Sequence, residues 1–250
     1  MGKRERLDFL LVQRRLVASR EEGRRKILAG AVLVNDQTVA KAGSLIDTSA
    51  QIRVKASSPY VGRGGLKLEK ALREFAVDAG GKTALDVGAS TGGFTDCLLA
   101  CGAVKVFAVD VGYGQLDWKL RSDPRVVAFE RTNIRHLEAT ALPCPVDLAT
   151  VDVSFISLKL VLPKVKEFLA ADGEVLALIK PQFEVGKGKV GKGGVVRSAE
   201  EHERVIEEIR DAARAMGFQV RGVTDSPLLG PAGNREFFIH LCLEPLPKRR

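Results

Sequence analysis

The sequence lacks any hydrophobic run that could cross a membrane as a helix, since no stretch approaches the roughly 18 consecutive apolar residues that a span needs. Its first fifteen residues are basic and hold no apolar segment followed by a cleavage site, so we expect no secretory signal peptide. Cysteine and histidine are scarce, with four and three residues in 250, and their spacing fits no metal-ligand pattern. These absences predict a cytoplasmic protein with reduced thiols, no membrane span and no metal site.

The excess positive charge is confined to one end of the chain. The formal net charge is +8, and residues 1–64 hold 13 Lys and Arg against 6 Asp and Glu, a net +7, which leaves +1 for the remainder. A surface charged only for solubility would spread this excess along the chain. The amino-terminal segment is therefore expected to bind a polyanion such as RNA.

This basic segment has the pattern of a small α+β domain. Apolar spacing predicts a short helix over 5–17, and Ser19 followed by Glu22 predicts a capping box that opens a helix over 20–29, with Gly30 after it. Short strands are expected at 32–34, 38–39 and 52–54. The pattern resembles the αL RNA-binding module of a small-subunit ribosomal protein, through Arg6-Leu-Asp8, Ser19-Arg20, Ile27, Gly30, Val32 and Val34-Asn35-Asp36. The resemblance implies that RNA is contacted by Arg6, Arg20, Arg24, Arg25 and Lys26, for which the alternative is a solvated helix face.

A segment of small and polar residues, 56–59, indicates a domain boundary. We expect an RNA-binding domain over 1–58, a linker over 59–64 and a larger domain over 65–250. The larger domain alternates strands and helices, which predicts a doubly wound, mainly parallel, seven-stranded Rossmann-like α/β sheet whose last two strands are antiparallel. The strands are expected at 83–88, 105–110, 125–129, 147–152, 174–180, 218–224 and 235–243. The helices are expected near 66–75, 93–101, 158–169 and 199–216.

The segment from Ala84 to Cys101 reads as a buried strand, a glycine turn and a helix. Gly88, Gly92 and Gly93 allow the backbone to approach a ligand closely, because no Cβ intervenes. Asp110 ends the next strand, 22 residues after Gly88, where an acid of a doubly wound fold binds a ribose hydroxyl. Together with Asp86, these residues predict a nucleoside site, for which the alternative is a tight turn and a helix cap. The G-x-x-x-G-G spacing differs from G-x-G-x-x-G and argues against a nicotinamide dehydrogenase.

Four charged residues are expected to meet at one end of this sheet. Asp152 and Lys180 end predicted strands, Glu236 opens the last one, and Lys67 lies on the helix over 66–75. Because ligands of open sheets bind at the carboxyl ends of the strands, the four side chains are expected beside the glycine turn. Two lysines and two acids suit the activation of a hydroxyl, since a neighbouring cation and burial favour the neutral, basic form of lysine. The alternative for each residue is a salt bridge at the end of the sheet.

A segment rich in Gly and Lys lies between residues 181 and 197. Gly186–Gly193 nearly matches the phosphate-binding G-x-x-x-x-G-K-[ST] loop, but Gly193 occupies the position of the magnesium-binding hydroxyl. We therefore exclude that motif. The segment is expected to be a mobile basic loop that closes over substrate, or else a merely disordered loop.

The whole chain resembles the TlyA family, also called haemolysin A, of FtsJ-type ribose 2′-O-methyltransferases. The resemblance lies in Asp86-Val-Gly-Ala-Ser-Thr-Gly-Gly-Phe-Thr-Asp96, Gly62-Arg-Gly-Gly-Leu-Lys67 and Lys180-Pro-Gln-Phe-Glu-Val-Gly186. It implies a catalytic tetrad of Lys67, Asp152, Lys180 and Glu236, S-adenosylmethionine as methyl donor, and cytidine 2′-hydroxyls of ribosomal RNA as acceptors. It assigns cofactor contacts to Asp86, Gly88, Ala89, Ser90, Gly92, Gly93, Phe94, Asp110, Asn133 and Asp152. The chain departs from many relatives in the linker, where Ser-Ser-Pro-Tyr60-Val61 stands in place of Arg-x-Trp-Val.

Two other classes of function remain open from the sequence. A haemolysin would need a membrane span or a strongly amphipathic insertion helix, and the sequence shows neither. A ribosome assembly factor that binds RNA without catalysis would carry the same basic amino-terminal segment. An intact tetrad favours the methyltransferase.

Overall fold

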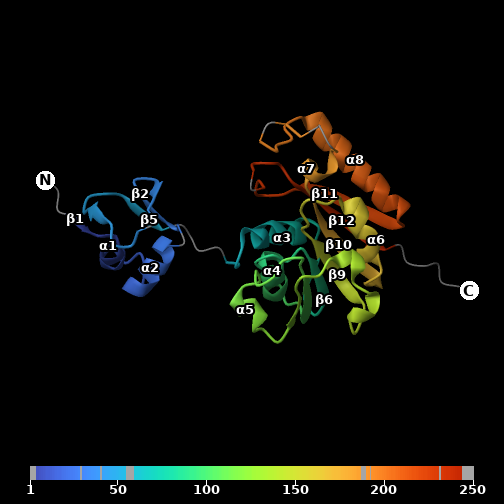
Figure 1. Ribbon diagram of the computed structural model, residues 1–250, viewed down its shortest axis with the longest axis horizontal. Helices are drawn as coiled ribbons and strands as arrows, with labels where there is room; N and C mark the ends of the chain where they lie inside the picture. The colour runs from blue at the N-terminus through green and yellow to red at the C-terminus, as the bar shows by residue number, and fades with distance from the viewer. Residues whose placement is uncertain are drawn as a thin grey trace, which may run out of the picture. The chain divides into compact units, whose positions relative to one another are not determined.

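The structure, a computed structural model, describes residues 4–28, 30–39, 41–54, 59–186, 190–191, 193–230 and 232–243 (Figure 1). The chain forms two compact units, Met1–Ser58 and Pro59–Arg250. Among the helices of the described ranges, none has the length and apolar character needed to cross a membrane.

The first unit packs two helices against short strands. Its elements are β1 (Arg4–Arg6), α1 (Leu7–Gln13), α2 (Arg20–Leu28), β2 (Val32–Val34), β3 (Gln37–Thr38), β4 (Leu45–Asp47) and β5 (Ile52–Val54). β2 lies between β3 and β5, antiparallel to both, and β1 pairs with β4. Leu7, Leu10, Leu11, Ile27 and Val32 form the centre of a small buried core.

The Ser19 half of the expected capping box is present at the start of α2, and Glu22 bonds one residue further back, to Ala18. Ser19 Oγ accepts a hydrogen bond from the Glu22 N–H at 3.1 Å, and Glu22 Oε2 accepts one from the Ala18 N–H at 2.8 Å. Gly30 follows α2 with a left-handed φ of 68°, as expected for a residue just past a helix end. α2 is thus delimited by local hydrogen bonding and by a residue without a Cβ.

The helix predicted over 5–17 is shorter than expected. Residues 4–6 form β1, and α1 ends at Gln13. The helix stops because Arg15 takes a left-handed φ of 57°, while the guanidinium of Arg14 donates to the carbonyls of Thr48 and Ala50 at 2.6 and 2.7 Å. Tertiary contacts therefore end this helix before its apolar pattern does.

The second unit is a seven-stranded sheet between two layers of helices, which confirms the predicted α/β fold. Its strands are β6 (Thr83–Val87), β7 (Lys105–Val109), β8 (Val126–Phe129), β9 (Val146–Val151), β10 (Leu169–Ile179), β11 (Phe218–Asp225) and β12 (Phe237–Leu243). Its α-helices are α3 (Arg63–Glu74), α4 (Gly93–Ala100), α5 (Trp118–Arg121), α6 (Leu158–Lys166), α7 (Pro181–Glu184) and α8 (Ala199–Ala215). Two 3-10 helices, η1 (Ile134–His136) and η2 (Ala139–Ala141), complete it.

The strands follow the order β11-β12-β10-β9-β6-β7-β8. The strands β6 to β10 pair in parallel, and β12 is antiparallel to both β10 and β11, as predicted for the last pair. Successive strand residues point to opposite faces. On β6, Ala84 joins the buried cluster of α3 and α4, whereas Leu85 joins that of α6 and α8.

Two segments differ in detail from the predicted elements. α3 begins at Arg63, inside the stretch 59–64 expected to be a linker, and Tyr60 is buried against Gly65 of the same helix. The expected loop over 181–197 opens with α7, while residues 187–189 and 192 lie outside the described residues. Its distal part is held by Asn234, which bonds Val196 N–H and the Gly194 carbonyl at 2.9 and 2.8 Å.

Candidate active site

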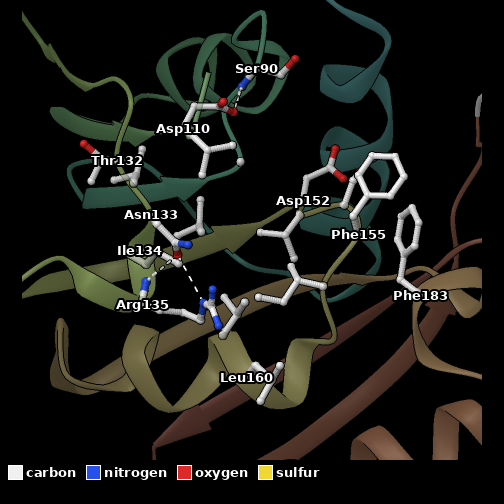
Figure 2. A pocket seen from close by; sticks show the side chains of 18 of the residues that line it. Ser90, Asp110, Thr132, Asn133, Ile134, Arg135, Asp152, Phe155, Leu160 and Phe183 are labelled. Carbon is white, nitrogen blue, oxygen red and sulfur yellow. Dashed lines mark hydrogen bonds between the residues drawn. The ribbon is translucent and has the colours of Figure 1, made fainter. Parts of the chain in front are cut away.

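A hollow of about 810 Å³ opens at the carboxyl ends of the parallel strands. β7 and β8 extend the sheet on one side of β6, and β9 and β10 extend it on the other, so the strand order reverses between β6 and β9. Ligands of doubly wound sheets bind at such a reversal. The hollow is lined by residues that follow β6, β7, β8 and β9 and by the start of α6 (Figure 2).

The glycine turn forms one wall of this hollow. Gly88 has a φ of 86°, and a Cβ there would lie 2.5 Å from the carbonyl oxygen of Asp152, so only glycine lets the turn pass this close to the end of β9. Gly93 likewise lies against the backbone of Gly64 and Gly65. The glycines therefore pack three backbone segments together at the site.

Asp110, directly after β7, is fixed at the rim. Its Oδ2 accepts a hydrogen bond from the Ser90 N–H at 2.8 Å (Figure 2). Its Oδ1 accepts one from the Gly112 N–H at 2.6 Å. A carboxylate oxygen has lone pairs for more than one hydrogen bond, so Asp110 can still accept from a ligand hydroxyl. Its geometry is set before any ligand arrives.

Asn133 and Arg135 lie on the side of the hollow next to β8. Asn133 Oδ1 accepts hydrogen bonds from the backbone N–H and the Nε of Arg135, at 3.1 and 3.4 Å (Figure 2). This arrangement caps η1 and leaves the Asn133 NH₂ group as a donor for a ligand. The guanidinium of Arg135 adds a positive charge beside it.

An aromatic pair stands on the far side of the hollow, next to Asp152. The rings of Phe155 and Phe183 lie 4.9 Å apart between centroids, and Phe155 is 90% exposed with a left-handed φ of 63° (Figure 2). Both phenylalanines, together with Leu160 of α6, were missed by sequence reasoning. The available signal was an aromatic residue three positions after the acid that ends a strand, where a polar loop would be expected.

A second, smaller hollow of about 140 Å³ adjoins the glycine turn. Its lining combines the turn with Asp152 and with Gly64 in the first turn of α3. Gly64 lies one turn before Lys67 on that helix, so the amino-terminal end of α3 faces this space. The N–H groups at such a helix end favour an anionic group.

The four predicted catalytic residues form two lysine–acid pairs at the same end of the sheet. Lys180 Nζ lies 2.6 Å from Asp152 Oδ1, and Lys67 Nζ lies 2.5 Å from Glu236 Oε2. The two pairs are neighbours, because Lys180 and Glu236 each stand one residue beyond the last paired residues of β10 and β12, Ile179 and Phe237.

The two lysine–acid pairs differ in how deeply they are buried. The side chains of Lys67 and Glu236 are 9% and 0% exposed, those of Lys180 and Asp152 are 11% and 22% exposed, and Asp152 lines both hollows. Lys180 Nζ also lies 2.9 Å from Ser154 Oγ. The Lys180–Asp152 pair is thus the one that borders the ligand space.

The remaining predicted cofactor residues divide between the hollows and the interior. Gly88, Ser90, Asp110, Asn133 and Asp152 line the large hollow, and Gly88, Ala89, Ser90, Gly93, Phe94 and Asp152 line the small one. Asp86 and Gly92 line neither. The Asp86 carboxyl is fully buried between Thr95 and Thr150, and a Cβ on Gly92 would meet Leu120. These two residues therefore pack beneath the glycine turn, in the protein interior.

Three of the predicted RNA-binding arginines converge in the first unit. Arg6, Arg20 and Arg24 all donate hydrogen bonds to the carboxylate of Asp8, which is fully buried. The arginine side chains themselves remain about half exposed.

The other two predicted RNA-binding residues are placed differently. Lys26 lies 3.6 Å from Glu22 on the same helix, and Arg25 is exposed. Arg6, Arg20 and Arg24 thus form one ordered cluster, and Arg25 and Lys26 lie outside it.

Comparison with known proteins identifies both parts of the chain. The family model described as FtsJ-like methyltransferase matches residues 60–243, and that of the S4 domain matches residues 5–52. The protein named "Putative rRNA methyltransferase YqxC" of Bacillus subtilis is 48% identical over 96% of this chain and 86% of its own length. The 16S/23S rRNA (cytidine-2′-O)-methyltransferase TlyA of Mycobacterium tuberculosis is 45% identical over 96% of this chain and 91% of its own. A solved structure, "Putative hemolysin from Streptococcus thermophilus", is 43% identical with a TM-score of 0.76, over 99% of this chain and 91% of that one.

Proposed function

Because the chain belongs to the FtsJ-like methyltransferase family and carries an S4 domain, we propose that it methylates a ribose 2′-hydroxyl of ribosomal RNA, with S-adenosylmethionine as methyl donor. The relative named as a cytidine-2′-O-methyltransferase supports cytidine as the nucleotide modified. An rRNA substrate also fits a cytoplasmic location. The observation that carries the proposal is the pair of lysine–acid contacts beside the hollow at the strand reversal.

The residues of the two hollows fit the proposed donor. A volume of about 810 Å³ lies within the usual range for small-molecule sites, about 300–1,000 Å³. Asp110 would accept hydrogen bonds from the ribose hydroxyls, and the NH₂ group of Asn133 would donate to the base. The small hollow at the start of α3 would take the carboxylate of the amino-acid part. When bound, S-adenosylmethionine supplies a methyl group attached to a positively charged sulfur.

The lysine–acid pairs would prepare the acceptor hydroxyl. A 2′-hydroxyl must lose its proton as it gains the methyl group, so a base has to lie within hydrogen-bond reach. We assign this role to Lys180 Nζ, with Asp152 orienting the amine from 2.6 Å. The pair of Lys67 and Glu236 is more deeply buried. It would hold α3 against the end of β12 and contribute charge beside the site.

The exposed aromatic pair would hold the target nucleotide. Phe155 borders Asp152 and stands out into solvent, and a nucleobase stacked on an aromatic ring gains about 1–3 kcal/mol. Such stacking needs no particular base sequence. In the first unit, Arg6, Arg20, Arg24, Arg25 and Lys26 would bind RNA phosphates and bring the chain to its substrate.

The proposal is tested by methyl transfer to purified bacterial ribosomal subunits, with S-adenosylmethionine labelled in its methyl group. We expect label in rRNA, and we expect mass spectrometry of the digested nucleosides to find the extra methyl group on the ribose of cytidine. Lys180→Ala should lower the rate about 10²–10⁴-fold, the usual contribution of a general base.

Lys82→Ala is a matched control for this variant. Lys82 also pairs with a carboxylate, Glu174 at 2.7 Å, but it precedes β6 and so lies at the opposite end of the sheet. This variant should keep the wild-type rate. Absence of label in any ribosomal subunit, or equal rates for both variants, would contradict the proposal and favour an RNA-binding factor without catalysis.

A further inference from the structure

A single buried carboxylate in the first unit holds three arginine side chains. Asp8 of α1 accepts hydrogen bonds from Nε and Nη2 of Arg6 at 3.0 and 3.1 Å, from Nη2 of Arg20 at 3.1 Å and from Nε of Arg24 at 3.2 Å. The hydrogen bonds from Arg6, then those from Arg20 and Arg24, hold the pKa of Asp8 well below its usual range. These bonds favour the charged form of the carboxylate.

The arginines reach this carboxylate from two different elements, and about half of each side chain remains exposed. Arg6 comes from β1, and Arg20 and Arg24 come from the first two turns of α2. Their side chains are 44%, 50% and 54% exposed, whereas that of Asp8 is 0% exposed. Each guanidinium has five N–H donors, and Asp8 uses only one or two of them, so the others remain available on the exposed side.

A surface arginine ordinarily loses side-chain freedom when it binds a phosphate, and this loss weakens binding. Here this side-chain freedom is already lost when the unit folds, because Asp8 fixes all three guanidinium groups next to one another. The cluster keeps a net charge of +2, from three guanidiniums and one carboxylate, which suits a backbone with one negative charge per nucleotide. The guanidinium fork also matches phosphate oxygens in geometry.

We propose that Arg6, Arg20 and Arg24 form one preorganised phosphate-binding site for RNA, and that Asp8 is the residue that positions them. The inference rests on the proposed function, which gives the first unit an rRNA partner. The inference predicts that these three arginines contribute more to RNA affinity than Arg25 and Lys26. The latter two lie on the same helix as Arg20 and Arg24 but do not contact Asp8 within the described residues. Coulomb's law alone gives no such ranking.

The first test keeps every charge and changes only the guanidinium fork. Binding of the full chain to purified bacterial ribosomal subunits is measured by filter binding with Arg24→Lys and with Arg53→Lys. Arg53 is a matched control, because it pairs with a single exposed acid, Asp36, in the same unit. A lysine at position 24 cannot bond the carboxylate and a phosphate through one rigid group, so we expect about tenfold weaker binding, about 1.4 kcal/mol. Arg53→Lys should bind like the wild type, and equal affinities of the two variants would overturn the inference.

The second test distinguishes positioning by Asp8 from simple attraction of charges, because the two predict opposite changes in RNA affinity. Asp8→Asn removes a negative charge, so attraction to a polyanion alone would tighten RNA binding. Loss of positioning should instead weaken binding about tenfold and raise KM for ribosomal subunits at unchanged kcat, because the proposed chemistry lies in the other unit. Asp36→Asn, which removes an exposed acid that also pairs with an arginine, should bind as tightly as the wild type or slightly more tightly.

Circular dichroism melts of each variant separate positioning from loss of the fold. If Asp8→Asn unfolds the first unit, the comparison of Arg24→Lys with Arg53→Lys decides. If the wild-type chain binds subunits and transfers methyl groups, tighter binding by a folded Asp8→Asn variant would overturn the inference and leave the proposed function standing. A wild-type chain that bound no ribosomal subunit would overturn the inference and the proposed function together.

Discussion

Replacing Asp86 by Asn should stabilise the protein at neutral pH, because this acid is buried and no cation among the described residues pairs with it. Asp86 lies on β6 with an exposed fraction of 0%, and Thr95 and Thr150 donate to its two oxygens at 2.7 and 3.1 Å. Burial, to which the charge of Asp152 adds, raises the pKa of this carboxyl from 3.8 to about 7. Asparagine can keep both contacts, since a threonine hydroxyl both donates and accepts.

The magnitude follows from the difference between the folded and unfolded chains. In the unfolded chain Asp86 ionises near pH 3.8, whereas the folded chain keeps it protonated up to about pH 7. Its contribution to stability is therefore full below about pH 3.8 and is lost as the pH rises to 7. The complete loss is about 4 kcal/mol, of which about 2–3 kcal/mol falls between pH 5 and pH 8.

The assay is urea unfolding of wild type and Asp86→Asn, followed by circular dichroism at pH 5 and pH 8. The advantage of the variant should be about 2–3 kcal/mol larger at pH 8 than at pH 5. Asp123→Asn is the control, because hydrogen bonds from Arg125 lower the pKa of Asp123 to about 2, so its contribution is constant over this range. An advantage of Asp86→Asn that did not change with pH would refute the reasoning. Calorimetry should find S-adenosylmethionine binding intact, since the Asp86 carboxyl lies outside both hollows.

Three further predictions concern the walls of the site. Gly88→Ala should abolish S-adenosylmethionine binding in calorimetry and destabilise the fold by about 2 kcal/mol or more in thermal melts, because its Cβ would lie 2.5 Å from the Asp152 carbonyl oxygen at a φ of 86°. Glu184→Ala should lower stability by about 1–3 kcal/mol in urea unfolding, since this half-buried carboxyl, whose pKa burial raises, accepts a hydrogen bond from the Leu158 N–H at the start of α6. An unchanged midpoint would contradict this. Phe155→Ala should raise KM for ribosomal subunits about tenfold while S-adenosylmethionine binding stays unchanged, and an unaltered KM would exclude stacking of the target base on this ring.

Where the governing interactions are local, residues close in the chain predict the structure. The capping box of Ser19 and Glu22 and the glycine after α2 follow from patterns a few residues long. The seven strands and the antiparallel last pair follow from alternation and loop length in the same way. The helix expected over 5–17 failed for the opposite reason, since Arg14 is drawn to carbonyls more than thirty residues away.

Residue spacing alone predicts the fold, a ligand site at one end of the sheet and the set of four charged residues, because each depends on local patterns and on the rule that ligands meet parallel strands at their carboxyl ends. How those four charges pair depends on the packing of the whole chain. Lys67 and Glu236 are 169 positions apart, and the register of β10 against β12 brings their pair beside that of Lys180 and Asp152. The same holds for Asp8, which looks like an ordinary surface acid until folding buries it under three arginines from two elements. Burial and partners of a charge depend on the whole packed chain, and no short pattern contains them.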